Sequence, residues 1–479
     1  EGAALEGIFF DAMIAAYVIN PSKSGYSLED IAWDYLGKSF KAESLNPAQR
    51  LALIQELKPK LEKEIEDKSL ANLFSRIEMP LVEVLGEMEA EGIKIDLKLL
   101  KHLSRDLENR LAKLIEEIYG VCGCQFNINS PKQLREVLFE KLKLRVIKRT
   151  KSGPSTDEEV LTKLAGEHEL PRKLLEYRQL AKLKSTYIDA LPEMVDSQTG
   201  RIHTSFNQTG TETGRLSSSN PNLQNLPAKT VLGRRIREAI IAFSPDSVLL
   251  SCDYSQIELR ILAHFSKDQA LISAFDEDKD IHRQTAAKIY GVEEKDVSEA
   301  MRDSAKSINF GIIYGLSSYG LSRDLNIRVE EAQGFIDAYF VTYPGVKIYI
   351  EEQIARAEKD GFVTTISGRR RYLPDVNNKN QAIRQFAQRQ AVNTPIQGSA
   401  SDLIKMAMVK IYNQMRLEKP DAAMILQVHD ELVFNVALSG LKSFSAMVKA
   451  NMENVLKLDV PVKVDIKAGK NWSEMQAVG

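Results

Sequence analysis

The chain has 479 residues, of which 43% are hydrophobic and 27% charged, and its formal net charge is −2. This length normally gives two or three globular domains, and no apolar run reaches the roughly 18 residues of a membrane-spanning helix, so we expect no membrane contact. The three cysteines match neither a disulfide framework nor a zinc site, which favours a cytoplasmic protein with reduced thiols. Because the sequence opens at Glu1 and not at a methionine, we expect a piece of a longer protein.

Amphipathic patterns follow residue 75. Apolar residues recur along two stretches, first Leu81, Val82, Val84 and Leu85, and then Leu100, Leu103, Leu107 and Leu111. Spacings of three and four residues put such side chains on one face of a helix, so the pattern predicts long helices over this part of the chain.

Two aspartates each stand at the end of a short apolar run. Asp253 follows residues 248–252, and Asp430 follows residues 424–429 and precedes a second apolar run at 432–434. A strand and a hairpin that each deliver one carboxylate can hold two Mg²⁺ ions roughly 3.5–4 Å apart, the arrangement used for in-line phosphoryl displacement. Aspartates are also common in turns at strand ends. The two residues alone leave both interpretations open.

Arg302, Lys306, Phe310 and Tyr314 recur every four residues between the two aspartates. Steps of four keep side chains near one helix face, and this series spans roughly 18 Å, about the length of an extended nucleoside triphosphate. The two cations suit phosphates, and the two aromatic rings suit a sugar and a base. A solvated basic face that ends in core aromatics would explain the residues singly but not their common register. Gly315 within this stretch is expected to permit close approach of another chain or ligand.

A polar ribbon with the same spacing precedes the second aspartate and consists of Arg389, Asn393, Gln397 and Ser401. Pro395 lies within it and is expected to bend or break the helix. Arginine, asparagine and glutamine can donate to the acceptors that every base pair displays in the minor groove. Alone this signal is weak, since a buried polar network is the commoner explanation for such a ribbon.

Together these segments resemble DNA polymerase family A, and among its members the large (Klenow-like) fragment of a bacterial DNA polymerase I of the Bacillus type. Residues 253–260, 302–315 and 426–434 match the three polymerase motifs of the family. Residues 213–218 with 221–227 match its upstream signature, and 280–283 and 394–398 match two further motifs. The similarity runs from about residue 75 to the C-terminus.

The resemblance implies an α+β fold shaped like a right hand, with an antiparallel palm sheet and helical fingers and thumb. We expect the thumb over residues 76–195, the palm over 196–262 and 395–479, and the fingers over 263–394. Residues 1–75 resemble the later part of a 3′→5′ exonuclease domain, whose first motif would lie upstream of Glu1. Asp11 and the Tyr26/Asp30 pair are the candidate nuclease residues of this vestigial segment, and we expect no functional proofreading from them.

The implied activity is template-directed DNA synthesis in replication and repair, in which deoxynucleotides are added to a primer 3′-hydroxyl and pyrophosphate is released. Two Mg²⁺ ions, which Mn²⁺ can replace, would be held by Asp253, Asp430 and the carbonyl of Tyr254. Lys306 would be a third catalytic residue, able to protonate the departing pyrophosphate. Glu431 points to the opposite face of its strand from Asp430, so we expect it to support the site rather than to bind the ions.

The resemblance also assigns residues to each substrate. The nucleotide would contact Gln256, Glu258, His282, Arg302, Lys306, Phe310 and Tyr314. The primer–template DNA would contact Arg215, Asn222, Gln224, Lys229, Arg389, Asn393, Gln397 and His429. Lys229 departs from the family, whose members commonly have arginine at that position, which puts a bidentate contact there in doubt.

Basic residues form two clusters despite the negative net charge, and the local field is what matters for phosphate binding. One cluster is Lys141, Lys143, Arg145, Lys148, Arg149 and Lys151, and the other is Arg369, Arg370, Arg371, Lys379, Arg384 and Arg389. We expect both clusters to flank the active site and to face DNA.

The expected partners are primer–template DNA and deoxynucleoside triphosphates, and the expected state is a monomer in the bacterial cytoplasm, associated with the nucleoid. Two alternatives are a catalytically altered DNA-binding paralogue and a polymerase with RNA-templated activity. The presence of both aspartates disfavours the paralogue. A single-subunit RNA polymerase shares the hand-shaped fold and is a further alternative. Glu258 disfavours it, because the Glu258 side chain would occupy the space that a ribose 2′-hydroxyl needs.

Overall fold

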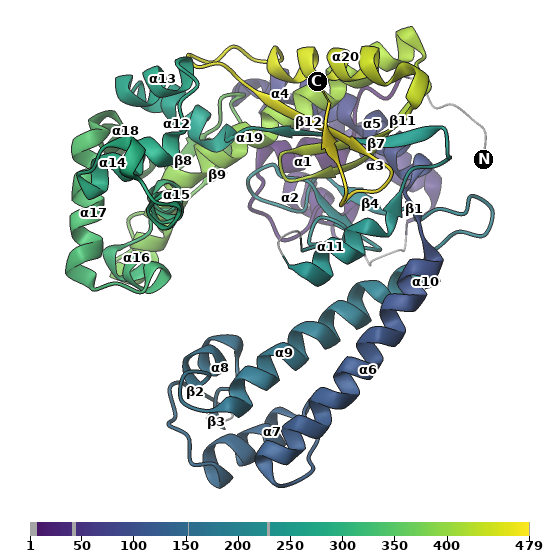
Figure 1. Cartoon of the computed structure of the whole chain (residues 1–479). Helices are drawn as coiled ribbons and strands as arrows, with labels where there is room; N and C mark the ends of the chain where they lie inside the picture. The colour runs from purple at the N-terminus through teal and green to yellow at the C-terminus, as the bar shows by residue number, and fades with distance from the viewer. Residues whose placement is uncertain (1–6, 41–44, 152, 228–229, 479) are drawn as a thin grey trace.

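The computed structural model describes residues 7–40, 45–151, 153–227 and 230–478, so Lys229 lies outside the described residues. Figure 1 shows a central antiparallel sheet with a lower helical lobe from residues 97–193 and a left-hand helical lobe from residues 257–360. The N-terminal helices lie behind the sheet in this view. One antiparallel sheet among many helices is the α+β arrangement that the sequence predicted. None of the helices within the described ranges combines the length and apolarity that a bilayer crossing requires.

The central sheet has the strand order β10-β11-β7-β12-β13, and each neighbouring pair is antiparallel. Its strands are β7 (Ser247–Tyr254), β10 (Ala422–Val428), β11 (Glu431–Ala437), β12 (Val464–Gly469) and β13 (Gln476–Ala477). Helices cover it, with α5 (Met79–Glu91) against β10 and α20 (Leu441–Glu453) against β7, β11 and β12. Burial of the middle strands explains why they read as continuous apolar runs rather than as an alternation.

Short elements border this sheet. β1 (Lys94–Ile95) pairs with β6 (Ile240–Ile241), β4 (Ser205–Asn207) with β5 (Ser217–Ser219), and β8 (Phe362–Thr364) with β9 (Arg370–Tyr372). α11 (Val231–Glu238) lies between β5 and β6 in the chain. The first of these pairs joins the base of the lower lobe to the segment that leads into β7.

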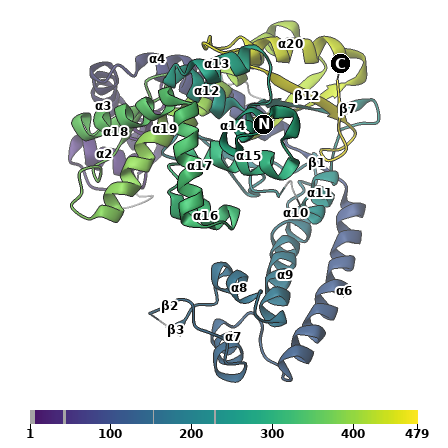
Figure 2. The same ribbon diagram turned by 60° about the vertical axis from the view of Figure 1, so that its left-hand side comes forward.

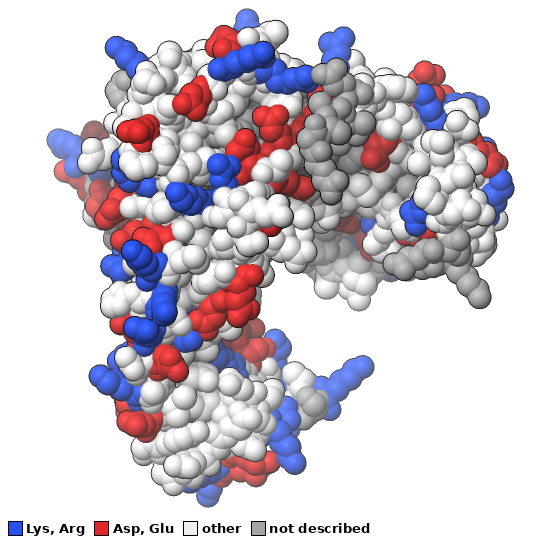
Figure 3. Space-filling model, turned by 90° about the vertical axis from the view of Figure 1, so that its right-hand side faces the viewer, with Lys and Arg blue, Asp and Glu red and all other residues white. Residues whose placement is uncertain are grey.

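The lower lobe is a long helical hairpin in which α6 (Leu97–Cys122) runs alongside α9 (Glu169–Leu183), as Figures 1 and 2 both show. Leu100, Leu103 and Leu107 are buried along α6, which confirms the predicted amphipathic helix. At the tip lie α7 (Pro131–Arg135), α8 (Glu158–Leu164), β2 (Arg149–Thr150) and β3 (Gly153–Pro154). In Figure 3 lysine and arginine side chains project from this lobe among acidic ones.

The left-hand lobe carries the helix that the four-residue series predicted. Its helices are α12 (Ile257–Ser266), α13 (Gln269–Asp276), α14 (Ile281–Tyr290), α15 (Glu299–Ile313), α16 (Ser318–Leu325), α17 (Val329–Thr342) and α18 (Pro344–Asp360). α15 packs against α14 and α16 and contains Arg302, Lys306 and Phe310. Tyr314 is the C-cap that ends this helix.

A single long helix links this lobe to the sheet. α19 (Gln381–Glu418) has 38 residues and continues through Pro395, so the expected break at this proline is wrong. Proline removes one backbone N–H from the helix, but Ala391 and Ile396 around it are fully buried, and their packing offsets the lost bond. The expected boundary between residues 394 and 395 therefore falls inside one continuous helix.

The N-terminal segment forms a core of its own from α1 (Ala12–Ile19), α2 (Leu28–Leu36) and α3 (Pro47–Asp67). Its candidate nuclease carboxylates serve as helix caps. Asp11 accepts a hydrogen bond from the Ile14 N–H (3.0 Å) at the start of α1. Asp30 forms a capping box with Ser27 at the start of α2. Both carboxylates thus have structural roles at helix N-termini.

Candidate active site

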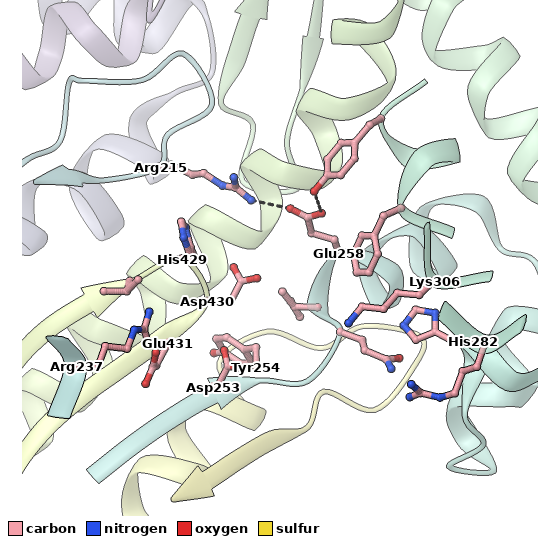
Figure 4. A pocket seen from close by; sticks show the side chains of 16 residues that line it. Arg215, Arg237, Asp253, Tyr254, Glu258, His282, Lys306, His429, Asp430 and Glu431 are labelled. Atoms are coloured by element: carbon pink, nitrogen blue, oxygen red, sulfur yellow. Dashed lines mark hydrogen bonds and ion pairs between the residues drawn. The ribbon is translucent and has the colours of Figure 1, made fainter. Parts of the chain in front are cut away.

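Asp253 and Asp430 face the same cleft from adjoining strands. Asp253 is the second-last residue of β7, and Asp430 lies with His429 in the two-residue turn between β10 and β11. The Tyr254 N–H donates to the Asp430 carbonyl (3.1 Å), which ties this turn to the end of β7. Figure 4 shows both carboxylates beside one another at the cleft. The structure therefore brings together the two residues that the sequence predicted as a pair.

Negative charge is concentrated around this pair. Asp253 lies opposite Glu431 on β11 and Asp465 on β12. Desolvation, and then repulsion from Glu431, Asp430 and Asp465, raises the pKa of Asp253 to about 7. Desolvation and repulsion from Glu258 raise the pKa of Asp430 to about 6. A cation between the two aspartates would relieve this repulsion, and carboxylate oxygens are the hard donors that Mg²⁺ prefers, so the residues fit a divalent cation site.

Two hydrogen bonds engage one carboxylate oxygen of Glu431. Its Oε1 accepts from the Ser251 hydroxyl (2.5 Å) and from the Trp472 indole N–H (2.9 Å). Ser251 lies on β7 two residues before Asp253, so Glu431 fastens the end of β11 to the strand that carries the first aspartate. This arrangement supports the prediction that Glu431 stabilises the site without binding a cation.

The cationic residues of α15 differ in how they are held. The Arg302 Nε donates to Asp280 (2.7 Å), the residue that caps α14. Lys306 extends into the cleft in Figure 4 and forms no ion pair within the described ranges of the chain. Phe310 and Tyr314 stack with ring centroids 6.5 Å apart. One face of the helix therefore presents two cations and then two aromatic rings, as predicted.

His282 supports this face from α14. Its ring lies 5.9 Å from that of Phe310, and its Nδ1 is 3.0 Å from the Asn309 amide nitrogen. Burial, followed by the nearby cations Lys306 and Arg302, lowers the pKa of His282 to about 4 against the opposing effect of Asp280. The ring is therefore neutral, and because the Asn309 amide donates to Nδ1, the ring proton resides on Nε2.

Glu258 links Arg215 on one side of the cleft to Tyr314, at the end of α15, on the other. Its carboxylate is buried, with Oε1 accepting from Arg215 (2.7 Å) and Oε2 accepting from the Tyr314 hydroxyl (2.9 Å). Burial and the Glu258 carboxylate raise the pKa of Tyr314 to about 12, so the hydroxyl stays protonated and remains a donor. Gln256 precedes Glu258 as the N-cap of α12, with a φ of 52°. The Glu258 carboxylate is thus fixed in position from both sides.

These residues line one cavity of about 630 Å³. It contains the predicted metal ligands, the predicted nucleotide contacts and two of the predicted DNA contacts, namely Asp253, Tyr254, Asp430, Gln256, Glu258, His282, Arg302, Lys306, Phe310, Tyr314, Arg215 and His429. Gln224 lines an adjoining pocket that shares Arg215, His429 and Asp430 with it.

The remaining predicted DNA contacts lie around this cavity. Gln224 donates to the Gln427 amide oxygen (2.9 Å), and Asn222 is exposed. Asn393 and Gln397 are partly buried on α19, and the Asn393 amide oxygen is buried without a hydrogen-bond partner among the described residues.

Arg389 packs beside the end of α15. A Cβ on Gly315 would lie 2.6 Å from the Arg389 Cγ, and Gly315 has a φ of 65°. Only glycine combines this backbone conformation with so close an approach. The expectation that Gly315 permits another part of the chain to come close is therefore confirmed.

Two members of the second basic cluster, Arg369 and Arg371, are engaged by carboxylates of the chain itself. Arg369 is 1% exposed and pairs with Glu78 and Asp402, beside the fully buried Lys405. Arg371 pairs with Glu212. A run of arginines in the sequence carries no information on burial, and carboxylates from distant parts of the chain neutralise these two.

Sequence reasoning missed Arg237, which lines the cavity, and Trp472, on which Arg237 stacks. Arg237 lies 16 positions before Asp253 and Trp472 lies near the C-terminus, so no local spacing relates them to the site. The only available signal was the arginine-rich stretch of α11, Arg234 to Arg237, which resembles an ordinary solvated helix face.

A sequence model described as DNA polymerase family A matches residues 97–474. "DNA polymerase I" of Bacillus subtilis (strain 168) is 44% identical over 490 residues, which cover 98% of this chain and 56% of that protein. "DNA polymerase I" of Caldicellulosiruptor bescii is 46% identical over 467 residues, which cover 97% of this chain and 55% of that protein. The chain thus spans about half the length of these relatives.

A solved structure of similar architecture is described as the POL domain of Pol1 from M. smegmatis in complex with DNA primer-template and dNTP. It is 39% identical, has a TM-score of 0.94, and the match covers 98% of this chain and 83% of that one. This similarity confirms the right-hand α+β fold that the motifs implied.

Proposed function

Because the chain belongs to DNA polymerase family A, we propose that it is a template-directed DNA polymerase that adds deoxynucleotides to a primer 3′-hydroxyl and releases pyrophosphate, in DNA replication and repair. One observation carries the proposal. Two carboxylates fixed by the sheet, Asp253 and Asp430, share a cavity with the cations of α15, Arg302 and Lys306. In the proposed reaction a triphosphate would meet the hydroxyl nucleophile there.

Membership of the family implies dependence on a divalent cation. We propose two Mg²⁺ ions, replaceable by Mn²⁺, held by Asp253, Asp430 and the carbonyl of Tyr254. Such ions lower the pKa of an attacking hydroxyl and stabilise negative charge on a leaving pyrophosphate. The role of the protein is to hold both carboxylates at one end of the cleft, and Glu431 contributes by fixing β11 against β7.

The α15 face would bind the nucleotide. Arg302 keeps both terminal nitrogens available for phosphate oxygens, because its bond to Asp280 uses Nε. Neutral His282 can donate from Nε2, and Lys306 can both bind phosphate and protonate the departing pyrophosphate. Phe310 would pack against the sugar and base, and Tyr314 would lie at the templating position. Gln256 and Glu258 would contact the nucleotide from the palm side.

The DNA would pass over the sheet and along α19. Arg215, Gln224, Asn393, Gln397 and His429 would contact the primer-terminal pair through minor-groove acceptors. Asn222, Lys229 and Arg389 would bind the strands nearby, and the basic tip of the lower lobe would hold the duplex by its phosphates.

The division into thumb (76–195), palm (196–262 and 395–479), fingers (263–394) and exonuclease remnant (1–75) remains our proposal. So do the absence of proofreading, the monomeric state and a cytoplasmic, nucleoid-associated location. The capping roles of Asp11 and Asp30 support the view that the N-terminal segment is structural.

Primer extension tests the proposed function directly. A labelled primer is annealed to a DNA or an RNA template of the same sequence and incubated with Mg²⁺ and either deoxy- or ribonucleotides. We expect extension on DNA with deoxynucleotides. Tight DNA binding without extension would identify a DNA-binding paralogue, and faster extension on the RNA template would identify an RNA-templated enzyme. Shortening of a mismatched primer by the chain would contradict the absence of proofreading.

A further inference from the structure

Arg237 is a cation in the cleft that the proposed mechanism does not use. It lies in the last turn of α11 and lines the same cavity as Asp253 and Asp430. Figure 4 shows it beside Glu431 and His429, on the opposite side of the aspartates from Lys306 and His282.

The guanidinium is oriented by an aromatic platform. Its central carbon lies 3.9 Å from the ring centroid of Trp472, which is 4% exposed. The indole N–H of Trp472 donates to Glu431, so the platform belongs to the same hydrogen-bonded unit that fixes β11 to β7. Stacking on a fixed ring holds the planar guanidinium in one orientation before any ligand arrives.

The hydrogen-bonding capacity of Arg237 is largely unused. Within the described ranges, Nη2 donates to the Leu226 carbonyl at 3.3 Å, whereas Nε is buried without an acceptor. Arg237 forms no ion pair with any described carboxylate. Buried donors are normally satisfied, and an arginine left partly unsatisfied beside an open cleft has the donors that an anionic ligand requires.

Position distinguishes the two phosphate-bearing substrates. Lys306, a cation that suits the triphosphate, lies on α15 on the other side of the aspartates from Arg237. Arg302 lies one turn earlier on the same helix. If α15 holds the triphosphate, an in-line attack brings the strand that supplies the 3′-hydroxyl from the opposite side of the aspartates, where His429 and Arg237 lie. Resting on the proposed function, we propose that Arg237 binds a phosphodiester of the primer strand close to its 3′ end and so positions the terminal hydroxyl at the two aspartates.

Methylphosphonate primers test this assignment. The primer–template Kd and the single-turnover extension rate are measured for the wild type, Arg237→Lys and Arg237→Ala, with the last phosphodiesters of the primer replaced one at a time by uncharged methylphosphonates. We expect Arg237→Ala to weaken primer–template binding about tenfold and to lower the log–log salt slope by about one, with an unchanged nucleotide KM. At one position, the methylphosphonate should weaken primer–template binding by the wild type by a similar factor. The same substitution should not weaken binding by Arg237→Ala any further, and its effect on Arg237→Lys should be intermediate.

Arg235→Ala is the matched control. Arg235 lies on the opposite face of the same helix and pairs with Glu238 at 3.3 Å, so its loss should leave the methylphosphonate pattern of the wild type intact. The proposal would be overturned if, at every position, the methylphosphonate weakened binding by Arg237→Ala as much as it weakened binding by the wild type. A raised nucleotide KM with unchanged DNA binding would also overturn it and would assign the contact to the triphosphate instead.

Two further results keep the test decisive. If Arg237→Ala lowers Tm enough to prevent assay, the wild type is compared with Arg237→Lys instead. Equal losses of primer–template affinity in these two proteins at every methylphosphonate position would contradict a phosphodiester contact. If the wild type fails to extend any primer, the proposed function fails, whereas the Kd pattern still tests the Arg237 contact by itself.

Discussion

The two walls of the cleft are held in different ways. On the sheet wall, Asp253 and Asp430 are placed by backbone pairing and by the bonds of Glu431, which no substrate has to break. On the helical wall, Arg302 and Tyr314 are engaged by the carboxylates of Asp280 and Glu258, at the places where a nucleotide would bind.

This contrast indicates a division of labour. The cation end of the site is built before substrates arrive, since preformed geometry on rigid strands is what charge stabilisation in a transition state requires. At the proposed nucleotide end, side chains already carry contacts with carboxylates, so part of the binding free energy of a nucleotide would be offset wherever it replaced one of these contacts. Variants of the helical wall should therefore change nucleotide use, whereas variants of the sheet wall should change chemistry.

Lys306 should give the largest effect on the helical wall, because it is the cation there that has no ion-pair partner in the described part of the chain. We expect Lys306→Ala to lower kcat/KM for the deoxynucleotide by about 10²–10³-fold through lost phosphate binding and proton donation, with primer–template Kd unchanged. Steady-state kinetics with Ser307→Ala, an exposed neighbour, as control would check this. A loss confined to DNA affinity would show that Lys306 contacts the DNA and not the nucleotide.

Glu258 should control the sugar. Its carboxylate is fixed by Arg215 and Tyr314. We therefore expect it to exclude a 2′-hydroxyl both by volume and by having its acceptors occupied. Glu258→Ala should raise the ribo/deoxy ratio of kcat/KM by about 10²-fold, whereas Glu258→Gln, with nearly the same shape, should raise it less. An unchanged ratio in Glu258→Ala would remove this residue from the nucleotide site.

Asp253→Asn should stabilise the protein in the absence of divalent cations at pH 8. Folding raises the pKa of Asp253 from 3.8 to about 7, so the stability associated with its protonated form is full below about pH 4 and is lost as the pH rises through 7. In EDTA the variant should melt a few degrees above the wild type at pH 8, and the difference should vanish below about pH 4. Solvent in the cleft screens part of this effect, because the side chain is open on one side.

Saturating Mg²⁺ should reverse the order, since cation binding stabilises the wild type more than a variant that lacks a ligand. Thermal unfolding followed across this pH range, with and without Mg²⁺, is the measurement. Equal Tm values at pH 8 in EDTA would show that Asp253 experiences no excess negative charge.

Tyr17 should give the smallest effect, through the loop that carries Arg215. Its hydroxyl donates to the Thr211 carbonyl (2.7 Å), and the Thr211 hydroxyl donates to the Arg215 carbonyl (2.8 Å). Tyr17→Phe leaves a partly buried carbonyl without its donor, at a cost of about 1–3 kcal/mol in unfolding free energy. Because Arg215 holds Glu258, we also expect the ribo/deoxy ratio to rise a few-fold.

Tyr26→Phe is the control for Tyr17. The two rings pack edge to face at 5.5 Å in the same core, but the Tyr26 hydroxyl donates to Asn20 inside the N-terminal segment. Both variants should lose stability in urea unfolding, and only Tyr17→Phe should change nucleotide selection. An equal ribo/deoxy ratio of kcat/KM in the two variants would mean that the N-terminal segment has a purely structural role.

The sequence predicted those parts of the site whose residues carry a local pattern. Asp253 and Asp430 follow apolar runs because their strands are buried in the sheet. The α15 residues share a face because they are four positions apart, close to the about 3.6 residues of one helical turn. The hairpin and helix could therefore be placed before any tertiary contact was known, and the family motifs supplied the right-hand arrangement.

The remainder depends on contacts between distant segments. Arg369 was expected at the surface, but Glu78 and Asp402 neutralise it in the interior. Pro395 was expected to bend or break its helix, and tertiary packing keeps that helix unbroken. The stack of Arg237 on Trp472 joins residues more than two hundred positions apart, and local periodicity contains no information about such pairs.

Asp253 and Asp430 are proposed to hold the cations of the reaction, and DNA affinity is proposed to come from the cationic and minor-groove contacts around them. Single-turnover extension and primer–template Kd, measured side by side for Asp253→Ala and Asp430→Ala, separate these roles most directly, with Asp465→Ala as the control carboxylate opposite Asp253. We predict that each aspartate variant loses at least about 10³-fold in rate while its Kd stays within about threefold of the wild type. Retention of more than a few per cent of the wild-type rate by either variant in Mg²⁺ would contradict the two-cation site.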